Sequence, residues 1–154
     1  MLSIGSSTKL VRVVANKTGT ALTGTTAETE IGTYTLPAGI LGATGMVRVT
    51  AFYSMVGTAG TKAPRIKFGG SAFVGNTNAA NVLSQSLIGL VINKTAGTQT
   101  CTALGSATGL GAVVSSSLSL AVDTTAPVVI QFTGQLGSAA DSITLDRYII
   151  EVVR

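Results

Sequence analysis

The chain lacks most of the side chains from which active sites are usually built. It has 154 residues, with no histidine, no tryptophan, one cysteine and only six aspartate or glutamate residues. Histidine is the commonest general base and a frequent ligand of catalytic zinc, so its absence removes the usual nucleophile and base pairs and most catalytic zinc sites. An aspartate-rich loop that could hold calcium is missing as well. The sequence therefore predicts a protein that is not an enzyme and has no catalytic residue, metal site, cofactor or small-molecule substrate.

Long apolar runs and a secretion leader are also missing. No window approaches the roughly 18 uninterrupted apolar residues that a membrane-spanning helix needs. The N-terminal stretch MLSIGSSTKLVRVVANKTG shows no charged leader followed by an apolar run of signal-peptide length. Cys101 has no second cysteine to pair with, so an intrachain disulfide is excluded and a buried thiol is expected. We therefore expect a soluble protein that is made in the cytoplasm without a signal peptide and does not bind membranes.

Charged residues are sparse in this chain. They make up 10% of it, against 45% hydrophobic residues, and the net charge of +4 comes from lysines and arginines that form no block. Basic residues are not interleaved with aromatic ones as in RNA-binding sheets, so a nucleic-acid partner is not expected. Threonine and serine supply most of the polar positions, and such a surface loses little when a neighbour buries it. The composition therefore favours assembly with other protein subunits.

The glycines and carboxylates fit structural roles better than chemical ones. In LPAGILGATGMVRVTAFYSM, residues 36–55, the glycines precede a strand, whereas a phosphate-binding loop opens a helix and ends in Gly-Lys-Ser/Thr. Glu28 and Glu30 have the spacing of a carboxylate pair on a strand, but they stand in a loop-like stretch and are expected to be solvated turn charges. Asp123 and Asp141 are expected to be turn residues whose side chains cap local backbone amides.

Strand signals outnumber helix signals along the chain, because Val, Ile, Thr and aromatic residues cluster in short runs separated by Gly, Asn, Asp and Ser. The expected strands cover residues 9–15, 29–36, 46–56, 65–68 with a continuation at 72–74, 83–93, 114–122, 128–132 and 142–153. Pro37 and Gly134 are expected to close two of them, and Gly89 to bend a third. A short helical turn within residues 79–90 is the alternative to a strand there.

Two of these runs carry most of the structural information. In residues 46–56 the apolar side chains alternate strictly, which is typical of an antiparallel strand with one buried face. In residues 142–153 the alternation breaks, so we expect either a bulge near Asp146 and Arg147 or burial of both faces. Asp146 and Arg147 are each expected to meet a cross-strand partner. The fold class predicted is all-β, an antiparallel β-sandwich of about eight strands of jelly-roll type, with an N-terminal arm at residues 1–8 and one domain at residues 9–154.

Three segments together resemble a known group of proteins. They are TYTLPAGILGATGMVRVTAFYS, PRIKFGGSAF and DTTAPVVIQFTGQLGSAADSITLDRYIIEVVR. These segments are similar to small jelly-roll virion proteins of tailed bacteriophages, which occur as capsid cement or decoration proteins and as terminal modules of tail fibres and spikes. The shared features are a leucine-proline-alanine corner, an Arg-x-Lys/Arg-Phe-Gly-Gly hairpin and a long final strand.

The resemblance implies a virion component without catalysis or cofactor, typically a trimer or dimer. It transfers no active-site residue, because the shared motifs are architectural. A capsid cement or decoration protein on the capsid exterior is the favoured expectation, with the major capsid protein and further copies of itself as partners. Such a protein stabilises the assembled shell by binding only to the assembled state. The alternative is a tail fibre or spike head that binds a host-surface receptor, and an unrelated β-sandwich binding module stays open.

Two segments are candidate contacts with the shell. The arm of residues 1–8 offers Leu2 and Ile4 as apolar anchors, with a frayed terminus as the alternative. Leu110, in the glycine-rich loop at residues 105–111, is the second candidate. Deletion of the arm is expected to weaken capsid binding without unfolding the domain.

Overall fold

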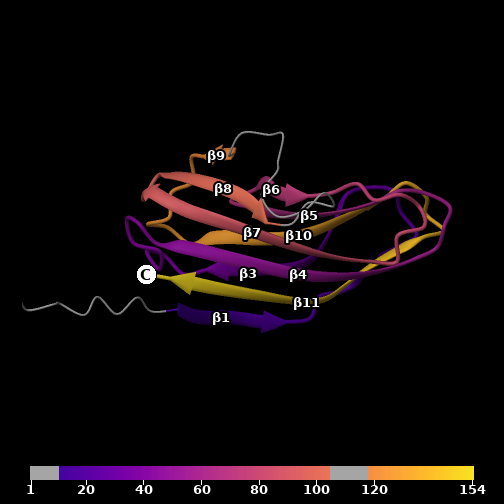
Figure 1. The fold of residues 1–154 in the computed structure, drawn as a ribbon, viewed down its shortest axis with the longest axis horizontal. Coiled ribbons are helices and arrows are strands. Elements are labelled where there is room, and N and C mark those ends of the chain that lie inside the picture. The colour runs from indigo at the N-terminus through magenta and orange to yellow at the C-terminus, as the bar shows by residue number, and fades with distance from the viewer. Residues whose placement is uncertain (1–10, 105–117) are drawn as a thin grey trace, which may run out of the picture.

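The computed structural model describes residues 11–104 and 118–154, and these residues form two antiparallel β-sheets packed as a sandwich (Figure 1). The predicted β-sandwich is thereby confirmed. The strands are β1 (Val11–Lys17), β2 (Ala21–Thr23), β3 (Thr29–Leu36), β4 (Met46–Val56), β5 (Lys62–Phe68), β6 (Ser71–Gly75), β7 (Ser84–Thr95), β8 (Thr98–Leu104), β9 (Leu118–Leu120), β10 (Val128–Leu136) and β11 (Ser142–Val153).

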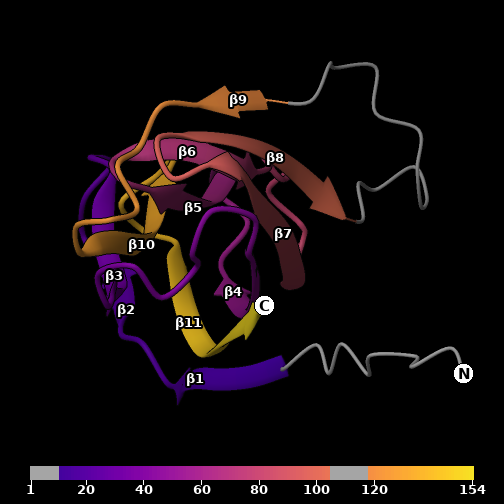
Figure 2. The ribbon, with the colours of Figure 1, turned by 90° about the vertical axis from the view of Figure 1, so that its left-hand side faces the viewer.

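The two sheets differ in size. The larger has seven strands in the order β1-β11-β4-β7-β8-β9, with β2 also paired to β11, and the smaller has four in the order β3-β10-β5-β6. Figure 2 shows the larger sheet following an arc from β1 at the bottom to β9 at the top, with β3, β10 and β5 on its inner side. The smaller sheet therefore covers the inner face of the larger one, and the outer face of each sheet is turned away from the core.

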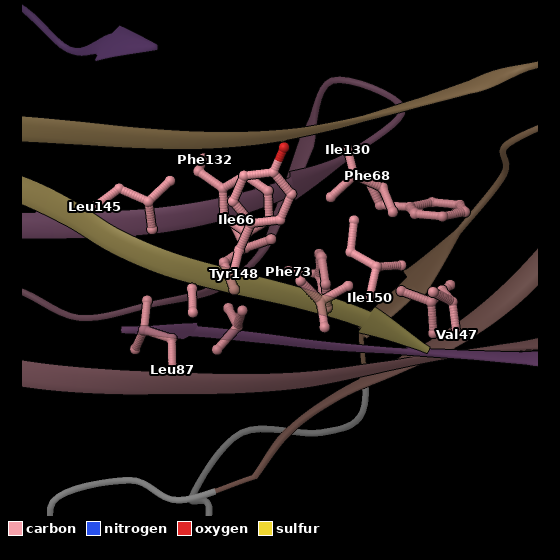
Figure 3. Close-up of a cluster of buried hydrophobic side chains, with 14 of the residues drawn as sticks. Val47, Ile66, Phe68, Phe73, Leu87, Ile130, Phe132, Leu145, Tyr148 and Ile150 are labelled. Carbon is pink, nitrogen blue, oxygen red and sulfur yellow. The ribbon is translucent and has the colours of Figure 1, made fainter. Parts of the chain in front are cut away.

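The core lies between the sheets and follows the predicted alternation. In β4 the side chains of Val47, Val49, Ala51, Tyr53 and Met55 are all buried, as their spacing indicates. Figure 3 shows side chains from both sheets meeting in this layer, and the rings of Phe132 and Tyr148 stack with their centroids 4.4 Å apart. Burial of each such aliphatic or aromatic side chain contributes about 1.5–3 kcal/mol to folding.

The break in the pattern of the last strand is a β-bulge. The register of β11 against β4 passes from Leu145 opposite Tyr53 to Arg147 opposite Phe52, which leaves Asp146 as the extra residue. The bulge returns Tyr148, Ile150 and Val152 to the core side after Ile143 and Leu145. The first of the two explanations offered by the sequence is therefore correct.

Several strand predictions need correction. The described residues form eleven strands rather than about eight, because β2 and β8 are not expected from the sequence and residues 72–74, expected as a continuation of the strand at 65–68, belong to a separate strand, β6. Gly134 does not close its strand, since β10 continues to Leu136. The bend expected at Gly89 stays a prediction. The register of β7 against β4 is regular at Gly89, and a Cβ at this position would overlap the ring of Phe73.

Two further expectations were settled only in part. Residues 79–82 make a single turn, closed by the Val82 amide donating to the Ala79 carbonyl, and the strand begins at Ser84. Of the strand expected at residues 114–122, the described part is β9, and residues 114–117 lie outside the described range. Within residues 11–104 and 118–154, no helix is long and apolar enough to cross a membrane.

Candidate interaction surface

The outer face of the seven-stranded sheet is apolar where a solvated sheet face is usually polar. Val11, Val153, Met46 and Ile92 pair in turn across β1, β11, β4 and β7, so their side chains form one row on this face. Val11 is 57% exposed and Ile92 37% exposed, and Met46 and Val153 are half-buried. Four neighbouring strands therefore present an uninterrupted line of hydrocarbon to solvent.

The neighbouring rows extend this surface. Val13 and Leu90 lie at the two ends of the second row, Ile149 and Ile88 belong to the third, and Phe52, at 41% exposure, lies on β4 beyond them. We call these side chains together the outer apolar patch: Val11, Val13, Met46, Phe52, Ile88, Leu90, Ile92, Ile149 and Val153. Contiguous exposed apolar patches of this kind mark interaction sites more often than scattered single side chains do.

One ion pair lies in the middle of the second row of the outer apolar patch. The Arg48 Nε donates to the Glu151 carboxylate at 2.6 Å, with Val13 on one side of the pair and Leu90 on the other. The hydrogen bond from Arg48 lowers the pKa of Glu151 below its ordinary value. The Arg48 side chain remains 47% exposed, so the pair presents both a positive and a negative group to an approaching surface.

The dimensions of this face suit a protein partner. Five strands, from β1 to β8, spaced by about 4.8 Å, and the eleven residues of β4, at about 3.4 Å each, give the whole outer face an area of about 700 Å². A standard protein interface buries about 800 Å² on each side. The outer apolar patch occupies part of four of these strands, and the whole face, with the serine and threonine positions around the patch, is large enough to form most of a stable interface.

The outer face of the four-stranded sheet has the opposite character. Glu28 is 2.7 Å from the Lys67 ammonium and 3.3 Å from the Arg65 guanidinium, and it accepts a hydrogen bond from Thr133. The hydrogen bonds from Lys67 and Thr133 lower the pKa of Glu28. Val129, at 40%, is the exposed large apolar side chain of this face. The contrast between the two faces shows that the apolar patch does not follow merely from the low charge of the chain.

The expectation of two solvated turn charges at Glu28 and Glu30 is wrong in part. Glu28 precedes β3 and is ion-paired, whereas Glu30 lies within β3 and accepts from the Gln131 amide at 2.8 Å. The two carboxylates thus have different partners. Their spacing in the sequence does not produce a shared site.

The edges of both sheets are poorly suited to pairing with another strand. β1, β3 and β6 each contain one extra residue opposite their neighbour, namely Val14, Ile31 and Phe73. The remaining edge strands, β2 and β9, have three described residues each. Bulges and very short strands are the usual means by which natural sheets prevent edge-to-edge association. The face of the larger sheet is therefore a better contact surface than any edge in the described part of the chain.

A buried charged cluster joins the loops at one end of the sandwich. Lys62 and Asp141 are almost fully enclosed, with their side chains 0% and 1% exposed and 3.5 Å between Nζ and Oδ2. The Lys62 ammonium donates to the carbonyls of Gly57 and Ala80, at 2.7 and 2.6 Å. Since both groups are sealed from solvent and already bonded, the cluster acts as a structural clamp.

Asp141 was expected to cap local backbone amides, and this expectation is wrong, because the amides that it caps are distant in the sequence. Its carboxylate accepts from the amides of Ala59 and Gly60, at 3.1 and 2.8 Å, which belong to the distant loop between β4 and β5. Burial acts to raise the pKa of Asp141, but these amides together with Lys62 outweigh it and hold the pKa below its ordinary value. By contrast, Asp123 caps the amide of Thr125 locally at 2.9 Å, as predicted.

The other sequence candidates have varied outcomes. Leu2, Ile4 and Leu110 lie outside the described residues, as does the arm. Cys101 is buried as expected, and burial raises the pKa of its thiol to about 11. Asp146 accepts from the Ser54 hydroxyl and Arg147 donates to the Asn16 side chain, which confirms their cross-strand contacts. In the described ranges, no group of three or more His, Cys, Asp or Glu side chains could hold a metal ion.

Comparison with known proteins gives little. No family model matches the sequence, and no curated protein matches it. Among the matching solved structures is dimeric latent PorU from Porphyromonas gingivalis, at 7% identity and a TM-score of 0.44. The match covers 90% of this chain but 12% of the PorU chain. A likeness at this level carries no information about function.

Proposed function

We propose that this chain is a non-enzymatic structural subunit, and within that class a capsid cement or decoration protein of a tailed bacteriophage. The observation that carries the proposal is the outer apolar patch, which would be unfavourable on a free, isolated molecule. Hydrocarbon removed from water contributes about 25 cal/mol per Å², so a partner that covers this face gains a large driving force. A protein whose main surface feature is a sheet face of this kind is suited to being built into an assembly.

The strand order supports the fold that the resemblance implies. Four antiparallel pairs are nested in sequence, β1 with β11, β3 with β10, β4 with β7 and β5 with β6. This nesting is what results when one long hairpin is rolled into two facing sheets, which is the jelly-roll arrangement, with β8 and β9 as an extension of the larger sheet. Jelly rolls are frequent in viral capsid proteins, and the three resembling segments lie largely in these nested strands.

Stabilisation of a shell needs no chemistry from this chain. A subunit that binds the assembled state and not its separate parts shifts the equilibrium towards assembly by mass action. The paucity of charge and the serine and threonine rim of the patch reduce the desolvation cost of such binding. These properties favour a virion exterior location over a free cytoplasmic role.

The second candidate is the head of a tail fibre or spike that binds a host receptor. The observation in its favour is a shallow groove of about 550 Å³ beside β6, lined by Arg65, Phe73, Asn76 and Thr77 among others. Phe73 is only 8% exposed, so it offers little ring surface on which a sugar could stack. The groove is therefore weaker support than the patch.

The test is the copy number of the chain in purified virus particles, measured by quantitative mass spectrometry against the major capsid protein. A ratio near the capsid subunit count, or a simple fraction of it, would support the shell role. A few copies in a multiple of three would favour the tail appendage. Absence from the particle would overturn both.

A second experiment tests whether the patch is used. Leu90→Lys is expected to abolish binding to shells that lack the protein, whereas Leu83→Lys, on an exposed leucine outside the patch, should leave binding unchanged. Equal binding of both variants would contradict the assembly role of the outer apolar patch.

A further inference from the structure

We infer that the occupant of the outer apolar patch is a second copy of this chain, related by a two-fold axis that runs parallel to the strands between β4 and β11. The inference rests on the proposed assembly role of the patch, and it names the neighbour that the patch contacts. The dimer formed in this way is then the unit that binds the larger assembly.

The argument begins with the position of the ion pair. Arg48 on β4 and Glu151 on β11 are direct cross-strand partners, so they lie on opposite sides of a line drawn between these two strands. A two-fold rotation about an axis along that line turns the second copy face down and exchanges the two sides. Arg48 of one copy then faces Glu151 of the other, and the reverse contact forms as well.

The apolar residues match under the same rotation. In the row that crosses β1, β11, β4 and β7, the operation places Met46 opposite Val153 and Ile92 opposite Val11 of the second copy. In the row with the ion pair, Leu90 comes opposite Val13. Two strands lie on each side of the axis, so every strand of the patch has a counterpart.

The third and fourth rows are compatible with this arrangement. In the third row Ile149 comes opposite Thr50 and Ile88 opposite Asn16 of the second copy, so each apolar side chain there meets a polar, uncharged one. In the fourth row the exposed ring of Phe52 comes opposite Arg147, a contact of cation–π type. Among the described residues of these four rows, no pair of like charges is created. A self-complementary contact requires that apolar and charged groups lie symmetrically about one line, whereas the binding of a partner of unrelated sequence does not.

The electrostatics give this geometry its specificity. Each copy keeps its own Arg48 to Glu151 hydrogen bond and adds two contacts across the axis, which makes an alternating ring of four charges. Such a ring is favourable only when positive groups meet negative ones, so it fixes the register of the two faces. Facing sheets keep their strand directions within about 30° of each other, and an axis parallel to the strands meets this condition, because it leaves the strands of the two copies parallel.

The experiment uses charge reversal in the full-length protein. Arg48→Glu makes both groups negative and Glu151→Arg makes both positive, so each variant repels its own copies at two symmetric contacts. A tenfold loss at each contact multiplies to about a 100-fold weaker dimer. Sedimentation equilibrium over micromolar concentrations is expected to show a dimer for the wild type and monomers for each variant alone.

The decisive step is to mix the two variants. An equimolar mixture is expected to form a heterodimer, because the all-negative face of one meets the all-positive face of the other. Lys94→Glu, a charge reversal on an exposed lysine outside the patch, should stay dimeric. A circular dichroism spectrum like that of the wild type and cooperative unfolding in urea would show that each variant is folded. The urea midpoint of each single variant is expected to fall, because the monomer lacks the stabilisation that the wild type gains from association.

Several results would overturn the inference. These are a monomeric or trimeric wild type, single variants that remain dimeric, and a mixture that stays monomeric. None of these results depends on the copy number in virus particles. A protein abundant in the shell but monomeric in solution would therefore contradict the two-fold contact and leave the proposed function standing.

Discussion

Replacement of the buried lysine should remove a large share of the stability of the fold. Lys62→Met keeps the length and most of the apolar stem of the side chain but deletes the ammonium group. The carbonyls of Gly57 and Ala80 then lose their donor, and Asp141 loses its cationic neighbour. Since the Lys62 and Asp141 side chains are 0% and 1% exposed, water cannot take the place of the lost ammonium group without an opening of the loops, and solvation does not recover the cost.

The expected magnitude follows from the contacts of Lys62. Breaking a buried ion pair by removing one partner costs about 3–5 kcal/mol, and the two carbonyls that lose their donor contribute to this cost. Domains of this size are stable by about 5–15 kcal/mol, so the variant should be folded but markedly weaker. With an m-value of about 2 kcal/mol/M in urea, the midpoint should fall by about 2 M.

The assay is equilibrium urea unfolding followed by circular dichroism. Lys94→Met serves as the control, because it makes the same substitution at an exposed lysine, and its midpoint should change by less than the error of the fit. A fall of less than about 0.5 M for Lys62→Met, which corresponds to about 1 kcal/mol at this m-value, would refute the reasoning that the clamp depends on this charge.

Three further predictions concern single groups. The pKa of Asp141 is lower in the folded state than its ordinary value of about 3.9, so its contribution to the free energy of unfolding is present above that pH and is lost as the pH falls through the folded pKa. The urea midpoint should therefore fall below about pH 4, and it should fall less in Asp141→Asn. The Tyr53 hydroxyl is buried without a hydrogen-bond partner among the described residues, so Tyr53→Phe should raise the free energy of unfolding by about 1 kcal/mol, and a loss of that size would contradict the assignment. Gly89→Ala should lower stability by about 1–3 kcal/mol in thermal melts, because its Cβ would overlap the ring of Phe73, whereas Gly97→Ala, in open space, should be neutral.

The sandwich could be predicted from the sequence because its longest strands carry complete local information. The alternation from Met46 to Val56 correctly predicts which face of β4 is buried, and the broken alternation of β11 predicts the bulge near Asp146. Strands without such a pattern were missed. β8 has the sequence TQTCTAL, in which threonine and glutamine occupy both faces, and β2 has three residues, too few to show a period.

The candidate surface was harder to predict, because it exists only once the register is known. The stretch YIIEVV at the end of the chain shows that Ile149 breaks the alternation, and this is the one local sign that the outer face of β11 is apolar. The patch itself needs β1, β4, β7 and β11 to be placed side by side, and β1 and β11 lie at opposite ends of the chain. The clamp between Lys62 and Asp141 depends on tertiary contact in the same way.

The edges and the face of the larger sheet bear on the same problem, which is how an apolar β-protein associates to a defined size. A free, flat edge would let copies add without limit, and the extra residues in β1, β3 and β6 remove that route. A face-to-face contact about a two-fold axis closes on itself, since each copy uses the same surface and none remains for a third. The outer apolar patch can therefore be strongly apolar without leading to open-ended aggregation, provided that its charged pair allows only one register.

If Arg48 and Glu151 are both replaced by apolar residues, the restriction on register is lost while the driving force for association grows, and we expect higher oligomers to appear beside the dimer in sedimentation. A double variant that remains strictly dimeric would show that shape alone, and not the charged pair, defines the contact.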